Sequence, residues 1–159
     1  MGARTYKTSI YFLSPFEQTL YLDADTELLC DPGSAFKLLN YADMVMAQDP
    51  IRIFNRNKWK GLVAAEIKYT IEATGGGELC YYNDGVILFK RNARVEALMK
   101  MWHEEWKRFK RQDQPAMLRA MYQCPVKLIT MREEFNTHKQ IADFVRHYHR
   151  RASRPGAPK

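Results

Sequence analysis

The chain has 159 residues, of which 46% are hydrophobic and 27% are charged. These are the values of one globular domain, and no apolar run approaches the roughly 20 residues that a helix needs to cross a bilayer. We therefore expect no transmembrane segment and, with no secretory leader, a cytoplasmic protein. The net charge of +7 favours an anionic partner such as nucleic acid, an anionic membrane surface or a nucleotide diphosphate.

The first predicted strand, residues 19–22, runs directly into two carboxylates, Asp23 and Asp25. Alternate side chains of an extended chain share a face, so both carboxylates can point the same way at the mouth of the strand. Two adjacent carboxylates repel each other unless a cation lies between them. Mg²⁺ and Mn²⁺ prefer oxygen ligands and also bind the diphosphate oxygens of nucleotides. The segment therefore favours a nucleotide-sugar site, although the same spacing also occurs in solvated loops.

A helix and a second strand follow the two carboxylates. Asp31 can cap a helix over residues 35–41, with Pro32 in its first turn, and an apolar strand covers residues 44–47. The result is a β-α-β-like unit with the acidic pair between its first strand and its helix. Ligands in open α/β sheets bind at the carboxyl ends of strands, so this end of the sheet is where the sequence predicts a site.

The middle of the chain is predicted to hold a helix, a glycine loop and a strand. Residues 62–71 have helical character and end near a glycine triplet, 75–77, which we interpret as a flexible hinge. The triplet is not a phosphate-binding loop, because no Lys-Ser/Thr follows it. The next strand is expected over residues 86–89, and Asn-Asp-Gly at 83–85 is typical of a turn ahead of that strand.

Two helices and a strand complete the predicted elements. Apolar residues at helical spacing predict a long helix over residues 93–110 and a shorter one over 116–122, with Asp113 as its N-cap. A strand covers residues 126–130. The tail, residues 150–159, is basic and rich in Pro and Gly, and we expect it to be disordered.

Five short segments stand in a particular order along the chain. They are PFEQTLYLDADT at 15–26, NDGVILF at 83–89, Trp102, DQPA at 113–116 and Phe-Asn at 135–136, followed by C-terminal histidines. Between residues 7 and 149 this order resembles the GT-A glycosyltransferases, in particular family 8 and its nucleotide-diphospho-sugar transferase relatives. The resemblance implies a GT-A fold, with a mixed α/β sheet flanked by helices, over residues 1–149.

The resemblance also implies a metal-dependent sugar transfer. Asp23 and Asp25 match the D-x-D motif that holds Mn²⁺ or Mg²⁺ against the donor's diphosphate, and a C-terminal histidine completes the metal site in family 8. His147 or His149 would fill that place, and we prefer His147; a neutral imidazole suits Mn²⁺ better than Mg²⁺. The implied reaction is a hexosyl transfer from a nucleotide diphosphate, by preference a UDP-sugar, to a hydroxyl of a sugar, protein or lipid acceptor. Likeness to family 8 throughout would imply retention of configuration.

The other site residues are carried over in the same way. Asp113 and Gln114 match the Asp-Gln pair beside the transferred sugar and are the candidate catalytic residues. Each assignment has an ordinary alternative: Asp113 can cap a helix, Asn83 can shape a turn, and the histidines can belong to a basic tail. The candidate substrate-binding residues are Lys7, Asp23, Asn83, Asp84, Gly85 and Asn136.

Two features depart from the family pattern. Asp84 stands where family members have Thr, Ser or Ala, so a third carboxylate either enters the pocket or turns outward. Only 22 residues precede Asp23, whereas the family's motif strand follows a long β-α-β segment that binds the base and the ribose. The chain is then a fragment, has a misassigned start, or is a minimal or truncated protein whose donor site a partner completes. The alternatives to an enzyme are a non-catalytic remnant that serves as an interaction module and, with less support, a nucleic-acid-binding domain.

Overall fold

A four-stranded mixed sheet organises the computed structural model, which describes residues 2–49, 62–76 and 81–148. The strand order is β1-β4-β3-β5, in which β4 runs antiparallel to both of its neighbours and β5 runs parallel to β3. Strands β1, β3 and β5 therefore point toward the same end of the sheet. The four strands are β1 (Gln18–Leu22), β3 (Met44–Gln48), β4 (Tyr82–Lys90) and β5 (Leu128–Met131).

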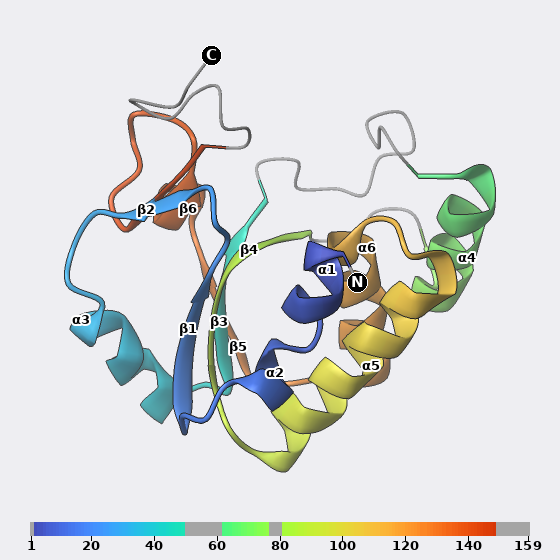
Figure 1. Ribbon diagram of the computed structural model, residues 1–159, viewed down its shortest axis with the longest axis horizontal. Helices are drawn as coiled ribbons and strands as arrows, with labels where there is room; N and C mark the ends of the chain where they lie inside the picture. Colours follow the sequence, from blue (N-terminus) through green and yellow to red (C-terminus); the bar gives the residue numbers. More distant parts are fainter. Residues whose placement is uncertain (1, 50–61, 77–80, 149–159) are drawn as a thin grey trace.

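Helices cover both faces of this sheet (Figure 1). A mixed sheet flanked by helices confirms the predicted fold class. None of the described helices is long and apolar enough to cross a membrane. One face carries α1 (Ala3–Lys7), α2 (Ile10–Leu13), α5 (Ala93–Phe109) and α6 (Asp113–Gln123), with α4 (Ala64–Thr74) packed on α6; the other carries α3 (Gly33–Phe36) and the 3₁₀ helix η1 (Lys37–Asn40).

The sheet divides the core in two, because successive side chains of a strand point to opposite faces. In β3, Met44 and Met46 belong to the apolar cluster formed with α5 and α6, whereas Val45 and Ala47 belong to the cluster formed with α3 and η1. All four side chains are fully buried. A strand that is apolar on both faces is typical of the centre of a covered sheet.

A second sheet of three short strands lies beside the end of β1. Its central strand β7 (Val145–His147) pairs antiparallel with β2 (Thr26–Leu28) and parallel with β6 (Asn136–Thr137). The 3₁₀ helix η2 (Glu133–Phe135) leads into β6. Sequence periodicity predicts none of these strands, because two or three residues are too few to show a pattern. The sheet nevertheless fixes the C-terminal part of the described chain next to the acidic pair.

Strand β4 is irregular where a pocket forms. Its register with β3 shifts after Met46, so that residues 84–86 have no partner in β3, while its pairing with β1 continues regularly to Val86. Such irregularities are frequent next to active sites, where they aim a side chain. Residues 83–85 therefore lie inside β4 and not in a turn ahead of it, which corrects the sequence-based expectation.

The predicted helix caps are also corrected. Asp113 is the first residue of α6, and its N-cap is Gln112, without a side-chain cap hydrogen bond. Asp31 lies one residue before the N-cap of α3, Pro32, and its carboxylate accepts a hydrogen bond of 3.2 Å from the backbone N–H of Gly33. The tail predicted to be disordered lies outside the described residues.

Candidate functional site

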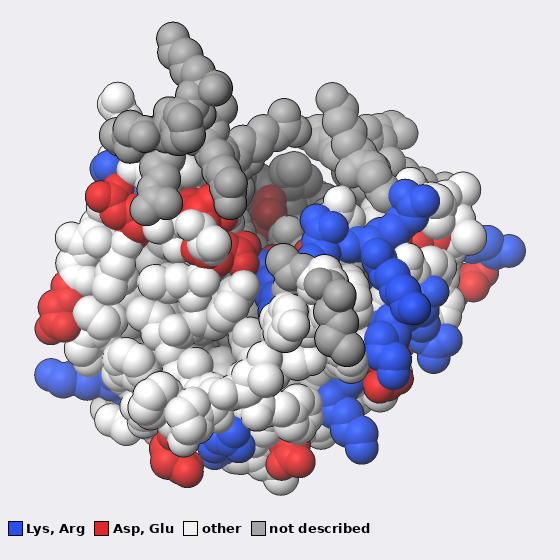
Figure 2. Space-filling model, viewed as in Figure 1, with Lys and Arg blue, Asp and Glu red and all other residues white. Residues whose placement is uncertain are grey.

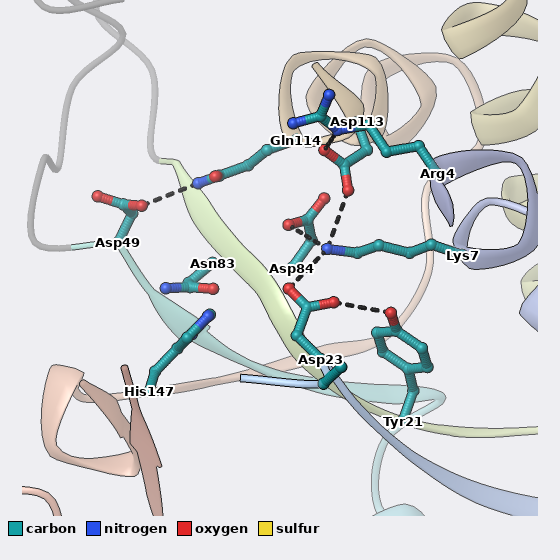
Figure 3. A pocket seen from close by; sticks show the side chains of 11 residues that line it. Arg4, Lys7, Tyr21, Asp23, Asp49, Asn83, Asp84, Asp113, Gln114 and His147 are labelled. Carbon is teal, nitrogen blue, oxygen red and sulfur yellow. Dashed lines mark hydrogen bonds and ion pairs between the residues drawn. The ribbon is translucent and has the colours of Figure 1, made fainter. Parts of the chain in front are cut away.

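A pocket of about 360 Å³ opens where β1 and β3 end and β4 begins. Asp23 follows β1 and Asp49 follows β3, so both lie on its walls. Figure 3 shows side chains from α1, β4, α6 and β7 converging on the same space. The carboxyl ends of strands are where open α/β sheets bind ligands. The lining residues are Arg4, Lys7, Tyr21, Asp23, Ala24, Asp49, Asn83, Asp84, Asp113, Gln114 and His147.

A buried lysine joins the carboxylates of three different elements. Nζ of Lys7, on α1, lies 3.0 Å from Oδ2 of Asp23, 3.0 Å from Oδ1 of Asp84 and 2.9 Å from Oδ2 of Asp113. Burial by itself favours the neutral amine, but the three carboxylates outweigh it and raise the pKa of Lys7 above its ordinary value. The charged side chain of Lys7 therefore joins the end of β1, the start of β4 and the start of α6 through ion pairs.

Asp84 is a buried carboxylate whose second oxygen is unsatisfied. Its Oδ1 atom contacts Lys7, whereas Oδ2 has no hydrogen-bond partner among the residues that the structure describes. Burial raises the pKa of Asp84 to about 7; Lys7 opposes this rise, and Asp113 and Asp23 add to it. Because Asp84 lines the pocket, the third carboxylate enters the site and does not turn outward. The pocket therefore contains a carboxyl group that can gain or lose a proton near neutral pH.

Asp23, Asp25 and His147 form a cluster of side chains that could hold a metal ion. One ligand atom of each residue lies within 4.8 Å of the other two. The second sheet brings them together, because β2, which follows the two acids, pairs with β7, which ends at His147. Carboxylate oxygens with an imidazole nitrogen suit Mn²⁺. His147, the histidine preferred from the sequence, thus lies at the acidic pair, and His149 lies outside the described residues.

His147 is held from both ring nitrogens. Its Nδ1 atom lies 3.1 Å from Oδ1 of Asn136, and its Nε2 atom lies 3.3 Å from Oδ1 of Asp25. Burial lowers the pKa of His147 even though Asp25 and Asp23 oppose it, so the ring is neutral at pH 7. With the hydrogen on Nδ1 and donated to Asn136, Nε2 turns its lone pair toward an oxygen of Asp25. A cation between these two atoms would relieve their repulsion, as in other sites where a hydrogen bond orients a metal-binding histidine.

The residues 83–85 shape the floor beneath this histidine. The side-chain oxygen of Asn83 accepts a hydrogen bond of 2.9 Å from the backbone N–H of Gly85. A Cβ atom on Gly85 would collide with Cε1 of His147 and would lie 2.8 Å from its Nδ1 atom. Asn83 lines the pocket, and Gly85 leaves the space that the imidazole fills. Asn136, predicted to bind substrate, is fully buried behind the ring and is placed to orient it.

Asp113 and Gln114 begin α6 and form the wall opposite the histidine (Figure 3). Oδ1 of Asp113 lies 3.2 Å from Nε of Arg4, in addition to the contact of its other oxygen with Lys7. Burial favours the neutral carboxyl, but Lys7 and Arg4 together lower the pKa of Asp113. The side-chain amide of Gln114 donates a hydrogen bond of 2.8 Å to Oδ2 of Asp49 across the pocket. Both candidate catalytic residues therefore face the same space as Asp23.

Three lining residues with polar side chains were not identified as site residues from the sequence. Asp49 follows β3 as Asp23 follows β1, so the pattern of an apolar strand ending in an acid could have indicated it. Tyr21 donates a hydrogen bond of 2.7 Å to Oδ1 of Asp23, and burial raises its pKa. Arg4 gave no signal, because a single basic residue near the start of a chain is compatible with any role.

Comparison with known proteins identifies the family. The sequence model of the nucleotide-diphospho-sugar transferases matches residues 18–152, which is most of the chain. The chain belongs to the nucleotide-diphospho-sugar transferase family. No curated protein sequence matches it.

The matched region of this nucleotide-diphospho-sugar transferase contains both sheets and the acidic pair with its histidine. Lys7 and Arg4, on α1, lie before the matched region, although their side chains contact Asp23 and Asp113 within it. The region that matches the family therefore contains the two sheets around the pocket. Helix α1 supplies two basic side chains that line the pocket.

Proposed function

We propose that this chain transfers a hexosyl group from a UDP-sugar to an acceptor hydroxyl, with a divalent metal ion at Asp23, Asp25 and His147. The observation that carries the proposal is this cluster, whose ligand atoms lie within 4.8 Å of one another at the end of β1. Family membership supports a nucleotide-sugar donor. The uridine base, the metal and the acceptor are our own inferences.

The donor atoms of the cluster fit Mn²⁺, and Mg²⁺ less well. Two carboxylates supply hard oxygen ligands, and the neutral, hydrogen-bonded His147 supplies the nitrogen that Mn²⁺ accepts more readily. When bound there, the ion would act as a Lewis acid that stabilises the charge developing on the leaving diphosphate.

The chain's own residues hold the sugar and the charges around it. Lys7 fixes the carboxylates of Asp23, Asp84 and Asp113 in one cluster, so the ends of three elements keep their positions when a ligand enters. In the proposed reaction the bond from the anomeric carbon to the diphosphate oxygen breaks, the acceptor oxygen bonds to that carbon, and the acceptor's proton passes to the leaving diphosphate. Asp113, held ionised by two cations, stabilises the positive charge that builds on the sugar ring, and Gln114 positions its hydroxyls.

The metal step is tested by titrating the protein with Mn²⁺, with and without UDP. Asp25 is part-exposed and its side chain contacts His147, so Asp25→Asn should fold while losing one charged ligand. We expect Mn²⁺ affinity to fall at least about tenfold in Asp25→Asn, as happens when metal-site residues are altered. UDP should tighten Mn²⁺ binding to the unchanged protein, because the diphosphate supplies further ligands.

Asp31→Asn is the matched control, because Asp31 is an exposed acid whose carboxylate contacts the backbone of α3. Equal Mn²⁺ affinity in Asp25→Asn and the unchanged protein would refute the metal site. A panel of UDP-glucose, UDP-galactose, UDP-N-acetylglucosamine and GDP-mannose then tests turnover. Metal binding without turnover of any donor would favour the non-catalytic remnant.

A further inference from the structure

Basic side chains gather on one side of the pocket mouth. Figure 2 shows Lys and Arg side chains beside the hollow, over α1 and the C-terminal end of α5 as placed in Figure 1. We define the basic rim as Arg4, Lys107, Lys110 and Arg111, all of which are exposed. Arg4 also lines the pocket, so the rim is continuous with it.

Helical spacing places one rim lysine on the side of α5 that faces α1. His103 and Lys107 are four residues apart and share one face of the helix, and Lys110 directly follows the helix. Nδ1 of His103 lies 2.9 Å from Oγ1 of Thr8, which directly follows α1. Lys107 therefore extends the face that contacts α1 toward the end of α5.

The turn from α5 to α6 completes the rim. Arg4 donates a hydrogen bond of 3.0 Å to the side-chain oxygen of Gln112, the residue that follows Arg111. The same guanidinium contacts Asp113 at the start of α6. Helix α1 and the α5–α6 turn thus form one surface that leads from the exposed lysines to the pocket.

Lys110 is a lysine where the backbone favours glycine. It ends α5 with φ of 52° and ψ of 33°, and among the described residues it is the one non-glycine residue with a positive φ. A residue without Cβ adopts this conformation more easily. Lys107 and Arg108 already supply positive charge to the last turn of α5. Lysine at this position therefore adds an exposed positive charge beside Arg111, in a backbone conformation that glycine adopts more easily.

The diphosphate of the donor is not the anion that faces this rim. Figure 3 places Arg4 and Asp113 on one side of the pocket and His147 on the opposite side. In the proposed reaction the diphosphate lies against the cluster that contains His147. A group bound at the rim would enter the pocket from the side that the diphosphate leaves free.

We propose that the acceptor carries a phosphate group and that the basic rim binds this phosphate while the acceptor hydroxyl reaches the sugar. The inference rests on the proposed function. Guanidinium and ammonium groups together are typical phosphate ligands. The carboxylates inside the pocket repel an anion and so keep the phosphate at the rim. The phosphate belongs either to a soluble phosphorylated sugar or to a lipid headgroup, and the two sources share this chemistry.

The test uses a double variant that removes charge without disturbing the pocket. Lys107→Gln loses an exposed pair with Glu104, and Lys110→Gly fits the left-handed backbone. The control is Lys37→Gln with Lys127→Gln, which removes the same charge from exposed positions on η1 and ahead of β5. The probes are glucose 6-phosphate, glucose, and phosphatidylcholine vesicles with or without phosphatidic acid.

We expect glucose 6-phosphate, but not glucose, to bind the unchanged protein in low salt. The affinity should fall at least about threefold in the rim variant and stay constant in the control, since exposed ion pairs contribute modestly and salt screens them. If the protein binds phosphatidic acid vesicles more tightly than glucose 6-phosphate, the acceptor's phosphate belongs to a lipid headgroup. If it binds glucose 6-phosphate more tightly, the phosphate belongs to a soluble sugar. Equal losses in the rim and control variants, or no phosphate binding at all, would overturn the proposal.

A parallel titration with Mn²⁺ and UDP separates this inference from the proposed function. The rim variant should bind both as the unchanged protein does, because its substitutions lie away from the metal cluster. If no protein binds Mn²⁺ and UDP while the rim variant alone loses phosphate binding, the proposed function fails. The rim then stands as an anion site without an acceptor role.

Discussion

Gly85 shows how little space the site leaves around its histidine. The glycine lies inside β4, and the imidazole of His147 occupies the space that a side chain at this position would need. The Asn-x-Gly pattern can be seen in the sequence, but the reason for the glycine cannot. The φ angle of Gly85 is not in the left-handed region, so the backbone conformation does not require glycine. The close approach of β7, more than 50 residues later in the chain, does require a residue without a side chain.

We predict that Gly85→Ala lowers Mn²⁺ affinity about 10–100-fold while the fold is retained. The added methyl group must push His147 away from Asp25, and displaced supporting groups typically cost that much. Titration with Mn²⁺ measures the loss, and thermal unfolding reports on the fold. Gly76→Ala is the control, since a Cβ there meets nothing within 4 Å. Unchanged affinity in Gly85→Ala would mean that His147 is not a ligand.

The sequence predicts the residues that belong to a recognisable motif. It misses the residues whose role depends on where the folded chain places them. Asp23, Asp113 and Gln114 could be named because short patterns surround them. Arg4 could not, because its role depends on α1 lying against the start of α6, a contact between residues more than 100 positions apart. Orientation is likewise absent from a pattern: the sequence predicts Asn136 as a substrate-binding residue but cannot show that its side-chain oxygen contacts Nδ1 of His147.

At the scale of elements, Asp43 joins several segments at the end of the sheet away from the pocket. The residue is fully buried and directly precedes β3. Its carboxylate accepts hydrogen bonds of 2.8 Å from Nε of Arg94, 2.8 Å from Nδ2 of Asn92 and 3.0 Å from the backbone N–H of Lys127. One side chain thus ties β3 to the start of α5 and to the segment ahead of β5.

We predict that Asp43→Asn lowers the free energy of unfolding by about 2–3 kcal/mol at pH 7, because hydrogen bonds to an ionised group are lost. Hydrogen bonds from Arg94, more than offsetting burial, lower the pKa of Asp43 below its ordinary value. A carboxylate with a lowered pKa stabilises the fold above its unfolded pKa, near 4, and that contribution is lost as the pH falls further. Urea unfolding between about pH 7 and pH 3 should therefore show the difference between variant and unchanged protein shrinking with acid.

The control for this experiment is Asp143→Asn, an exposed acid that should change stability by less than about 0.5 kcal/mol at every pH. A difference for Asp43→Asn that stays constant from neutral to acid would show that packing, and not charge, is what the substitution removes.

Long elements were predicted from the sequence and short ones were not. Helix α5 was expected over residues 93–110 and ends at Phe109 in the structure. It could be predicted because seventeen residues give several turns of apolar spacing. The strands of the second sheet have two or three residues each, and their pairing depends on the folded chain. The metal cluster depends on this second sheet, so the sequence could place its two acids together but could not show what brings the histidine to them.

At the scale of the whole molecule, α4 is joined to the rest through a buried polar cluster. Arg119 on α6 is completely buried; its Nε lies 2.8 Å from Oε2 of Glu105 on α5, and its Nη1 donates to Oγ1 of Thr70 on α4 at 2.8 Å. The same Nη1 lies 3.4 Å from Oε1 of Glu66. Since α6 begins with Asp113 and Gln114, the cluster that positions α6 also positions one wall of the pocket.

We predict that Arg119→Met lowers the free energy of unfolding by about 3–5 kcal/mol, because Glu66 would remain buried without its cation and Glu105 would keep only its contact with the exposed Arg108. Replacing both acids by Gln in the same protein should recover part of the loss, since no charge is then left unpaired. Arg132→Met, which breaks an exposed pair with Glu134, is the control and should cost less than about 1 kcal/mol. Urea unfolding measures all three. If Arg119→Met costs no more than the control, apolar packing alone holds α4 in place, and the wall formed by α6 does not depend on the buried charges.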